Sequence, residues 1–184
     1  MTRIIAGRLR GRRLKVPDEG TRPTSDRVRE SVFNMLEHRC DLAEARVLDL
    51  YAGSGALGLE AISRGAASAT LVDSGRKAAA TIADNARSCG VADSVTVVNR
   101  SVGAYLAGPT DRAFDLVFAD PPYDVDVSTV RADMEAVVVR LAAGALVVLE
   151  RSARAVDLDW PDDFEVVVDK KYGDTRVEVA RHDG

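Results

Sequence analysis

Residues 46–58 read RVLDLYAGSGALG, and this stretch decides the fold. Its first half is an apolar run typical of a buried strand, which we predict over 46–51. Its second half carries Gly53, Gly55 and Gly58 in the spacing G-x-G-x-x-G, which lets a chain turn tightly and approach a ligand closely. We therefore predict a strand, a glycine-rich turn and a helix over 55–64, the opening unit of an α/β domain.

Apolar strands and amphipathic helices keep alternating after this unit. Further strands are predicted over 69–73, 94–99, 114–120 and 145–150, and further helices over 75–89, 101–107 and 128–142. Gly144 is expected to end the last helix. Such strands form a parallel sheet covered by helices on both faces. The final strands, 164–170 and 175–180, have no helix between them and predict an antiparallel hairpin. The pattern is that of the Rossmann-like class I methyltransferases, with a mostly parallel seven-stranded sheet that ends in a hairpin.

The charge distribution separates a basic N-terminal segment from an acidic body. The 184 residues suit one domain, and their formal net charge is -4. Residues 1–29 hold nine basic and three acidic side chains, a balance of +6, which leaves -10 for the remainder. We predict a basic extension over 1–20 with a small β-hairpin (3–6 and 13–16). A methyltransferase domain over 21–184 follows, and its first helix is expected at 26–38.

Other features exclude several classes of protein. No run approaches the roughly 18 apolar residues of a membrane span, and the N-terminus lacks the apolar segment of a secretory signal. Cys40 and Cys89 cannot form a disulfide framework and predict reduced thiols in a cytoplasmic protein. His38 and His182 have no partners at metal-ligand spacing, so we expect no metal. We also expect a monomer and no membrane partner.

The glycine turn predicts a cofactor site. Asp73 ends the second strand, where a carboxylate can accept hydrogen bonds from ribose hydroxyls. Asp49 lies at the mouth of the turn, where it would oppose a dinucleotide pyrophosphate but favour the cationic groups of S-adenosylmethionine. Asp49 could instead be a helix or turn cap, and the residues that end the third strand could be an ordinary loop. The expected cofactor-binding residues are Asp49, Gly53, Ser54, Gly55, Asp73, Asn99 and Arg100. The cofactor would be S-adenosylmethionine, and its product S-adenosylhomocysteine.

The motif Asp120-Pro121-Pro122-Tyr123 ends the fourth strand. The prolines fix the backbone and remove two N–H donors, so a carbonyl and the Asp120 carboxylate face outward as acceptors. Tyr123 offers a flat face on which a base can stack, a contact worth about 1–3 kcal/mol. Acceptors beside a stacked base suit an exocyclic amine that attacks a methyl carbon. We expect these four residues to be catalytic, and a rigid loop is the alternative.

A carboxylate at position 120 favours guanine as the target base. Guanine presents two adjacent donors, N1–H and the N2 amine, and an acceptor-only group can meet both. Adenine presents a donor beside an acceptor, which suits an amide better. The N4 amine of cytosine stays open.

Five segments together resemble the bacterial small-subunit (16S) ribosomal RNA guanine-N2 methyltransferases, the RsmD-like family. The segments are RIIAGRLRGRRLKVP (3–17), RPTSDRVRESVFNML (22–36), DLYAGSGALGLEAISRGA (49–66), DPPY (120–123) and KKYGDTRVEV (170–179). The resemblance implies a class I fold, S-adenosylmethionine as donor, and methylation of one guanine N2 in an assembled or assembling small subunit. It places Asp49, Gly53 and Gly55 in the cofactor loop, Asp73 at the ribose and residues 120–123 at the catalytic motif. Residues 99–100 depart from an acidic residue that this family often has near the adenine.

The basic extension is the expected RNA-binding part, acting as a flexible hairpin that grips phosphates. A solvated run of charge is the alternative. The expected RNA-binding residues are Arg8, Arg10, Arg12, Arg13, Arg22, Arg27 and Arg29. The implied partners are 16S ribosomal RNA and the small ribosomal subunit.

Three other functions stay open on the sequence. An amino-methyltransferase with a related Pro-Pro-aromatic motif could act on DNA or on protein glutamine. A dinucleotide-dependent oxidoreductase would need a second substrate region, for which the length hardly allows room. A ribosome-assembly factor without catalysis would bind RNA only.

Overall fold

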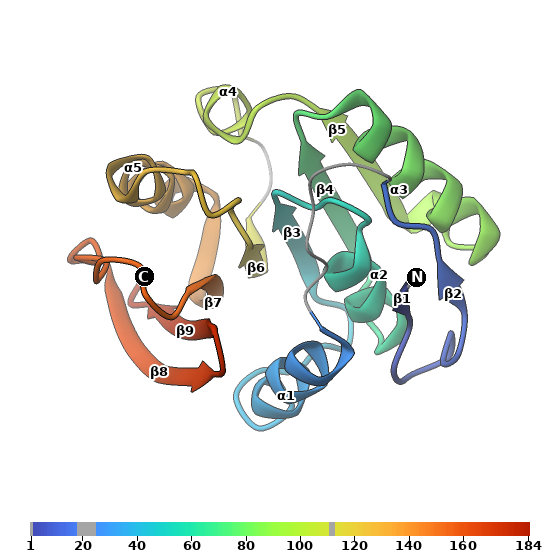
Figure 1. Cartoon of the computed structure of the whole chain (residues 1–184), viewed down its shortest axis with the longest axis horizontal. Coiled ribbons are helices and arrows are strands. Elements are labelled where there is room, and N and C mark those ends of the chain that lie inside the picture. Colours follow the sequence, from blue (N-terminus) through green and yellow to red (C-terminus); the bar gives the residue numbers. More distant parts are fainter. Residues whose placement is uncertain (1, 18–24, 111–112) are drawn as a thin grey trace.

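A seven-stranded sheet forms the centre of the molecule (Figure 1), in the order β5-β4-β3-β6-β7-β9-β8. The computed structural model describes residues 2–17, 25–110 and 113–184. Five strands are parallel, namely β3 (Arg46–Leu50), β4 (Ser68–Asp73), β5 (Val95–Asn99), β6 (Phe114–Ala119) and β7 (Leu141–Ser152). The last two form the predicted hairpin, β8 (Phe164–Tyr172) and β9 (Thr175–His182), with β9 antiparallel to both neighbours. The predicted fold class is thereby confirmed.

Helices cover both faces of this sheet (Figure 1). One face packs against α1 (Asp26–Leu36), α2 (Ala56–Ser63) and α3 (Arg76–Ser88), and the other against α4 (Val102–Leu106) and α5 (Val127–Val137). Each face has its own apolar cluster, built around Phe33, Leu59 and Ile82 on the first face. Within the described residues, no helix is long and apolar enough to cross a membrane.

The chain between α5 and β7 differs from the prediction of a helix up to residue 142. The helix ends at Val137, one 3-10 turn covers Val138–Arg140, and β7 begins at Leu141. The Arg140 guanidinium donates hydrogen bonds to the carbonyls of Tyr105, Leu106 and Gly108, which holds this turn against the end of α4. Gly144, with φ 74°, lies inside β7, where the register against β6 shifts, and does not end the helix. The helical periodicity of the sequence did not predict where this helix ends, because an apolar residue such as Leu141 suits a buried position in a helix and in a strand alike.

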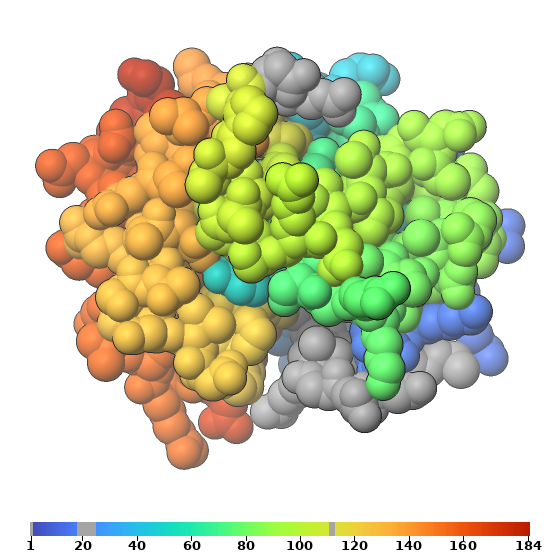
Figure 2. All heavy atoms as spheres, turned by 90° about the horizontal axis from the view of Figure 1, so that it is seen from above, coloured from blue at the N-terminus to red at the C-terminus, as the bar shows by residue number. Residues whose placement is uncertain are grey.

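The N-terminal hairpin is shorter than predicted, with β1 at Thr2–Arg3 and β2 at Arg13–Leu14. It packs against the domain. Ile4 and Leu14 are each 1% exposed and join the apolar cluster beneath α1, α2 and α3. Both figures show the hairpin, in blue, beside the green helix α3 (Figures 1 and 2).

Two side chains of α2 hold the hairpin in place through its backbone. Glu60 is fully buried, and its carboxylate accepts hydrogen bonds from the N–H groups of Ile5 (2.8 Å) and Ala6 (2.9 Å). Ser63 accepts from Arg8 through its carbonyl and from Leu9 through its hydroxyl, both at 2.9 Å. The arginines at the tip are therefore presented from a fixed backbone.

Candidate active site

A cavity of about 1120 Å³ opens at the carboxyl ends of the central parallel strands. Viewed from above, segments from the middle and from the C-terminal part of the chain meet over the sheet (Figure 2). The wall of the cavity includes the turn after β3, the end of β4, the start of α4, the loop after β6 and the β8–β9 turn. Residues of α1, α5 and β7 complete it, with Val16 from the segment after β2. Ligands of open α/β sheets bind at this edge, so the cavity is the candidate active site.

Asp73, at the end of β4, binds the glycine turn through a backbone N–H group, a role that the sequence prediction of ribose contacts did not include. One Asp73 oxygen accepts from the Gly53 N–H (2.9 Å) and the other from the Gly75 N–H (2.8 Å). Gly53, Ser54 and Asp73 all line the cavity. Gly55 does not, and its role is packing: with φ 78°, a Cβ there would lie 2.8 Å from Leu71 Cδ2.

Asp49 takes the capping role that the sequence left open as the alternative to cofactor binding. Its Oδ2 accepts from the Gly58 N–H (3.0 Å) in the first turn of α2, and the residue also lines the cavity. The side chain is almost entirely buried. Burial, together with the nearby carboxylates of Asp120 and Asp73, raises the pKa of Asp49 to about 8, while the hydrogen bond from Gly58 opposes the shift. A cation placed here would favour the ionised form.

The Asp120–Tyr123 motif lies on the same cavity as the glycine turn. Asp120 directly follows β6, the strand that pairs with β3. The backbone bends back at once, since the Val125 N–H donates to the Pro122 carbonyl (3.0 Å). Tyr123 is 59% exposed, so its ring is open to a base presented from outside.

The third-strand residues are not placed as predicted. Neither Asn99 nor Arg100 is among the lining residues, and the Asn99 side-chain amide instead donates to the Asp73 carbonyl (2.9 Å). The next three residues, 101–103, line the cavity in their place. The chain therefore reaches the cavity at the start of α4, directly after the two predicted residues.

Five of the predicted RNA-binding arginines are exposed: Arg8, Arg10, Arg12, Arg13 and Arg27. Arg22 lies outside the described residues. Arg29 was predicted wrongly, because it is fully buried and binds the hairpin. It donates to the Thr2 hydroxyl (3.1 Å), to the Arg3 carbonyl and to Asp26 (3.0 Å), and its Nε lies 3.9 Å from Glu60. Helix α1 turns this arginine toward the core, whereas Arg27 faces solvent.

Several lining residues were missed in the sequence. Tyr51 directly follows β3 with φ 61°, and its hydroxyl donates to Asp133 Oδ2 on α5 at 2.6 Å. Burial raises the pKa of both groups. Glu150 and Tyr172 line the cavity from β7 and β8. Applying the strand-end rule to every strand, and not only to the ones with motifs, would have found Tyr51 and Glu150.

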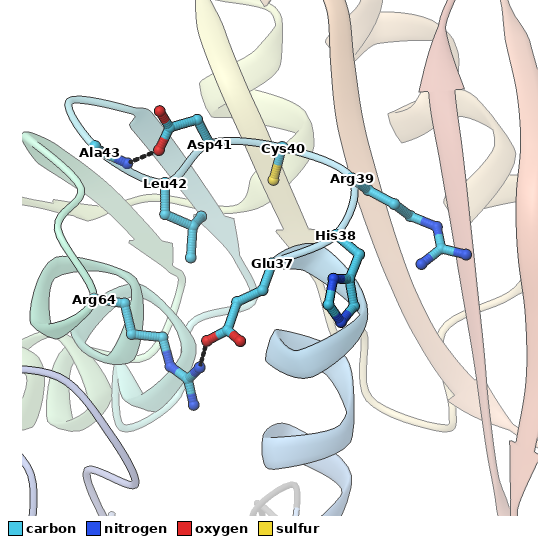
Figure 3. Close-up of a pocket in the computed structure, with 8 residues that line it drawn as sticks. All are labelled: Glu37, His38, Arg39, Cys40, Asp41, Leu42, Ala43 and Arg64. Atoms are coloured by element: carbon cyan, nitrogen blue, oxygen red, sulfur yellow. Dashed lines mark hydrogen bonds and ion pairs between the residues drawn. The ribbon is translucent and has the colours of Figure 1, made fainter.

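A second, shallower hollow of about 540 Å³ lies where α1 leads into β3, at the opposite end of the strand (Figure 3). Its wall is mostly polar, and Glu37 and Arg64 form an ion pair across it at 2.6 Å. Burial raises the pKa of the Cys40 thiol to about 11, so this sulfur is not an activated nucleophile. The described residues contain no group of three or more His, Cys, Asp or Glu arranged to hold a metal.

Comparison with known proteins identifies a matching family and several relatives. The family described as "Conserved hypothetical protein 95" matches residues 2–181. "Ribosomal RNA small subunit methyltransferase D" of Escherichia coli strain K12 is 46% identical over 122 residues, which are 66% of this chain and 60% of that protein. The protein of the same name from Haemophilus influenzae is 40% identical over 129 residues, covering 68% of this chain and 66% of that protein. The match with the Escherichia coli relative thus spans less than two thirds of its length.

Among solved structures, "Putative methyltransferase yhhF from Escherichia coli" superposes with a TM-score of 0.87 and 34% identity. The alignment covers 98% of this chain and 97% of that one. The likeness therefore extends over the whole fold, including the N-terminal hairpin and the C-terminal strands.

Proposed function

This chain belongs to the family described as conserved hypothetical protein 95, and on that premise we propose that it methylates a guanine N2 of small-subunit ribosomal RNA. Relatives named ribosomal RNA small subunit methyltransferase D confirm the family resemblance predicted from the five sequence segments. One observation carries the proposal: a single cavity holds the glycine turn and Asp73 on one side and the Asp120–Tyr123 motif on the other.

The side of the cavity formed by the glycine turn fits S-adenosylmethionine. Each Asp73 oxygen accepts one backbone N–H and keeps lone pairs that can accept bonds from ribose hydroxyls. Asp49, buried at the base of the turn, favours the ammonium group of a methionine moiety over an anionic pyrophosphate. The cofactor would supply a methyl group on a sulfonium sulfur, which would leave as a neutral thioether without the help of a metal.

The other side of the cavity fits a flipped base. Asp120 and the backbone carbonyls beside it accept hydrogen bonds from the target amine, which directs the nitrogen lone pair toward the methyl carbon. These acceptors also stabilise the positive charge that develops on the nitrogen during transfer. Tyr123 stacks on the base and offsets part of the few kcal/mol that flipping costs.

The exposed arginines of the hairpin supply the contacts to RNA phosphates. Arg8, Arg10, Arg12 and Arg13 project from a backbone that α2 holds in place, so they can set the position of the RNA relative to the cavity. The names of the relatives support small-subunit ribosomal RNA as the substrate. Its context in our proposal is the assembled or assembling subunit. Ribosome methylation would take place in the cytoplasm.

The test offers a labelled methyl donor together with purified small subunits, naked ribosomal RNA, DNA and total protein. We expect label in small-subunit RNA with the wild-type chain and none with Asp120→Ala, whose S-adenosylhomocysteine affinity should stay within a few-fold of wild type. Label in DNA or in protein instead would support the alternative acceptors and contradict the proposal. Titration with S-adenosylhomocysteine and with a nicotinamide dinucleotide distinguishes a methyltransferase, which binds the first ligand, from an oxidoreductase, which binds the second.

A further inference from the structure

The side chain of Asn85 joins the basic hairpin to the glycine turn. Asn85 lies near the end of α3 and is 1% exposed. Its Oδ1 accepts from the Lys15 N–H (2.9 Å), while its Nδ2 donates to the Lys15 carbonyl (2.9 Å) and to the Ser54 carbonyl (2.9 Å). One amide therefore satisfies both backbone groups of a hairpin residue and one carbonyl of the turn.

The two segments that Asn85 joins both reach the candidate active site. Ser54 lines the cavity within the glycine turn, and Val16, which follows Lys15, lines the same cavity. On its other side, Lys15 continues into β2 and the exposed arginines of the hairpin. The connection through Asn85 thus runs from the proposed cofactor site to the proposed RNA-binding surface.

We propose that Asn85 is a positioning residue that couples occupancy of the glycine turn to the position of the hairpin segment at Lys15. This inference rests on the proposed function. When the cofactor fixes the turn, the Ser54 carbonyl fixes the Asn85 amide, and the amide fixes the backbone of Lys15. Because coupling between two binding sites is reciprocal, RNA held by the hairpin strengthens cofactor binding by the same factor.

The other attachments of the hairpin make this coupling separable from folding. Glu60 and Ser63 bind residues 5–9 from α2, and none of their side-chain hydrogen bonds within the described residues involves Lys15. The hairpin therefore stays docked when Asn85 is changed. Asn85→Asp is the more selective variant, because its carboxylate still accepts from the Lys15 N–H but can donate neither to the Ser54 carbonyl nor to the Lys15 carbonyl. Asn85→Ala removes all three bonds and covers the case in which the buried charge prevents folding.

Ser63→Ala is the matched control. It also deletes buried hydrogen bonds to the hairpin, because the Ser63 hydroxyl accepts from Leu9 (2.9 Å) and donates to the Ala6 carbonyl (2.5 Å). Ser63 itself, however, lies on α2, and the hydrogen bonds of its hydroxyl do not include the glycine turn. A loss caused only by a weaker hairpin would appear in this variant as well.

The experiment measures hydrogen exchange at the Lys15 amide with and without saturating S-adenosylhomocysteine, after calorimetry has established its affinity for each protein. We expect the ligand to slow exchange about five-fold or more in the wild type and in Ser63→Ala, the lower end of typical coupling between sites. In Asn85→Asp and Asn85→Ala we expect a change below about two-fold, with the ligand still bound.

Equal protection in the Asn85 variants, or none in the wild type that binds the ligand, would overturn the coupling and leave the proposed function standing. Asn85 variants that fold but no longer bind the ligand would also overturn it, because the coupling requires a turn that still binds. Failure of the wild type itself to bind S-adenosylhomocysteine would refute the proposed function together with this inference.

Discussion

Glu60 binds two backbone N–H groups of the docked hairpin, and Glu60→Ala measures how far the docking depends on it. The substitution leaves the N–H groups of Ile5 and Ala6 without their acceptor, and it removes a 2.9 Å ion pair with Arg64 on the next helical turn. Arg64 keeps Glu37 as a partner and Arg29 keeps Asp26, so neither charge is left alone. The main cost is therefore the pair of unsatisfied backbone donors.

The magnitude follows from these contacts. Breaking a buried ion pair costs about 3–5 kcal/mol when a charge is left uncompensated. Here the arginines retain partners and the two N–H groups are only partly buried, so we expect about 3 kcal/mol. For a chain of this length each kcal/mol lowers the melting temperature by about 2–4 °C, which gives a fall of roughly 6–12 °C.

Urea unfolding followed by circular dichroism checks this value, and hydrogen exchange at Ile5 and Ala6 shows where the loss occurs. Glu135→Ala is the matched control, since Glu135 also pairs with an arginine one helical turn away (Arg131, 3.0 Å) but on an exposed face. That pair should contribute no more than about 0.5 kcal/mol. If both variants lost the same small amount, the hairpin would not be held by Glu60 and the reasoning would fail.

Three further outcomes are expected. Asp120→Asn should lower kcat on RNA about 100-fold or more with S-adenosylhomocysteine affinity nearly unchanged, as measured by single-turnover methylation and calorimetry; unchanged guanine methylation would remove the argument for a carboxylate. Tyr123→Ala should raise KM for RNA by about five-fold or more, whereas Tyr123→Phe keeps the stacking face and stays near wild type, and equal effects would exclude stacking. Because burial raises the pKa of Asp49 to about 8 in the folded chain, the folded state binds the proton more tightly than the unfolded state, and this group destabilises the fold as the pH rises from about 4 to about 8. Asp49→Asn should remove that decline in the free energy of unfolding, measured with urea. In the wild type we expect the affinity for S-adenosylhomocysteine to rise as Asp49 ionises, and Asp49→Asn should remove this rise too. A wild-type affinity that does not change with pH would contradict the role of the Asp49 charge.

The sequence was most informative where local chemistry and the sheet agree. The glycine turn, Asp73 and the Asp120–Tyr123 motif each follow a parallel strand, and all parallel strands of one sheet end at the same edge. Their meeting in one cavity could therefore be predicted without coordinates. The same rule explains why Tyr51 lines the cavity, although nothing in its own chemistry indicated so.

Tertiary contacts were harder to predict. Arg29 belongs to a basic segment, yet it turns into the core because Glu60 and Asp26 provide buried and half-buried carboxylates there. Asn85 looked like an ordinary helical residue, since its partners lie 70 and 31 positions away. Charge and periodicity describe one segment at a time and carry no information about such distant partners.

Nucleoside analysis tests methylation at guanine N2 most directly. Small subunits from cells lacking this protein are incubated with the purified chain and a labelled methyl donor, and their RNA is digested to nucleosides and separated by chromatography with mass detection. We expect label in N2-methylguanosine alone, and none with Asp120→Ala. Label in N4-methylcytidine or N6-methyladenosine would contradict it.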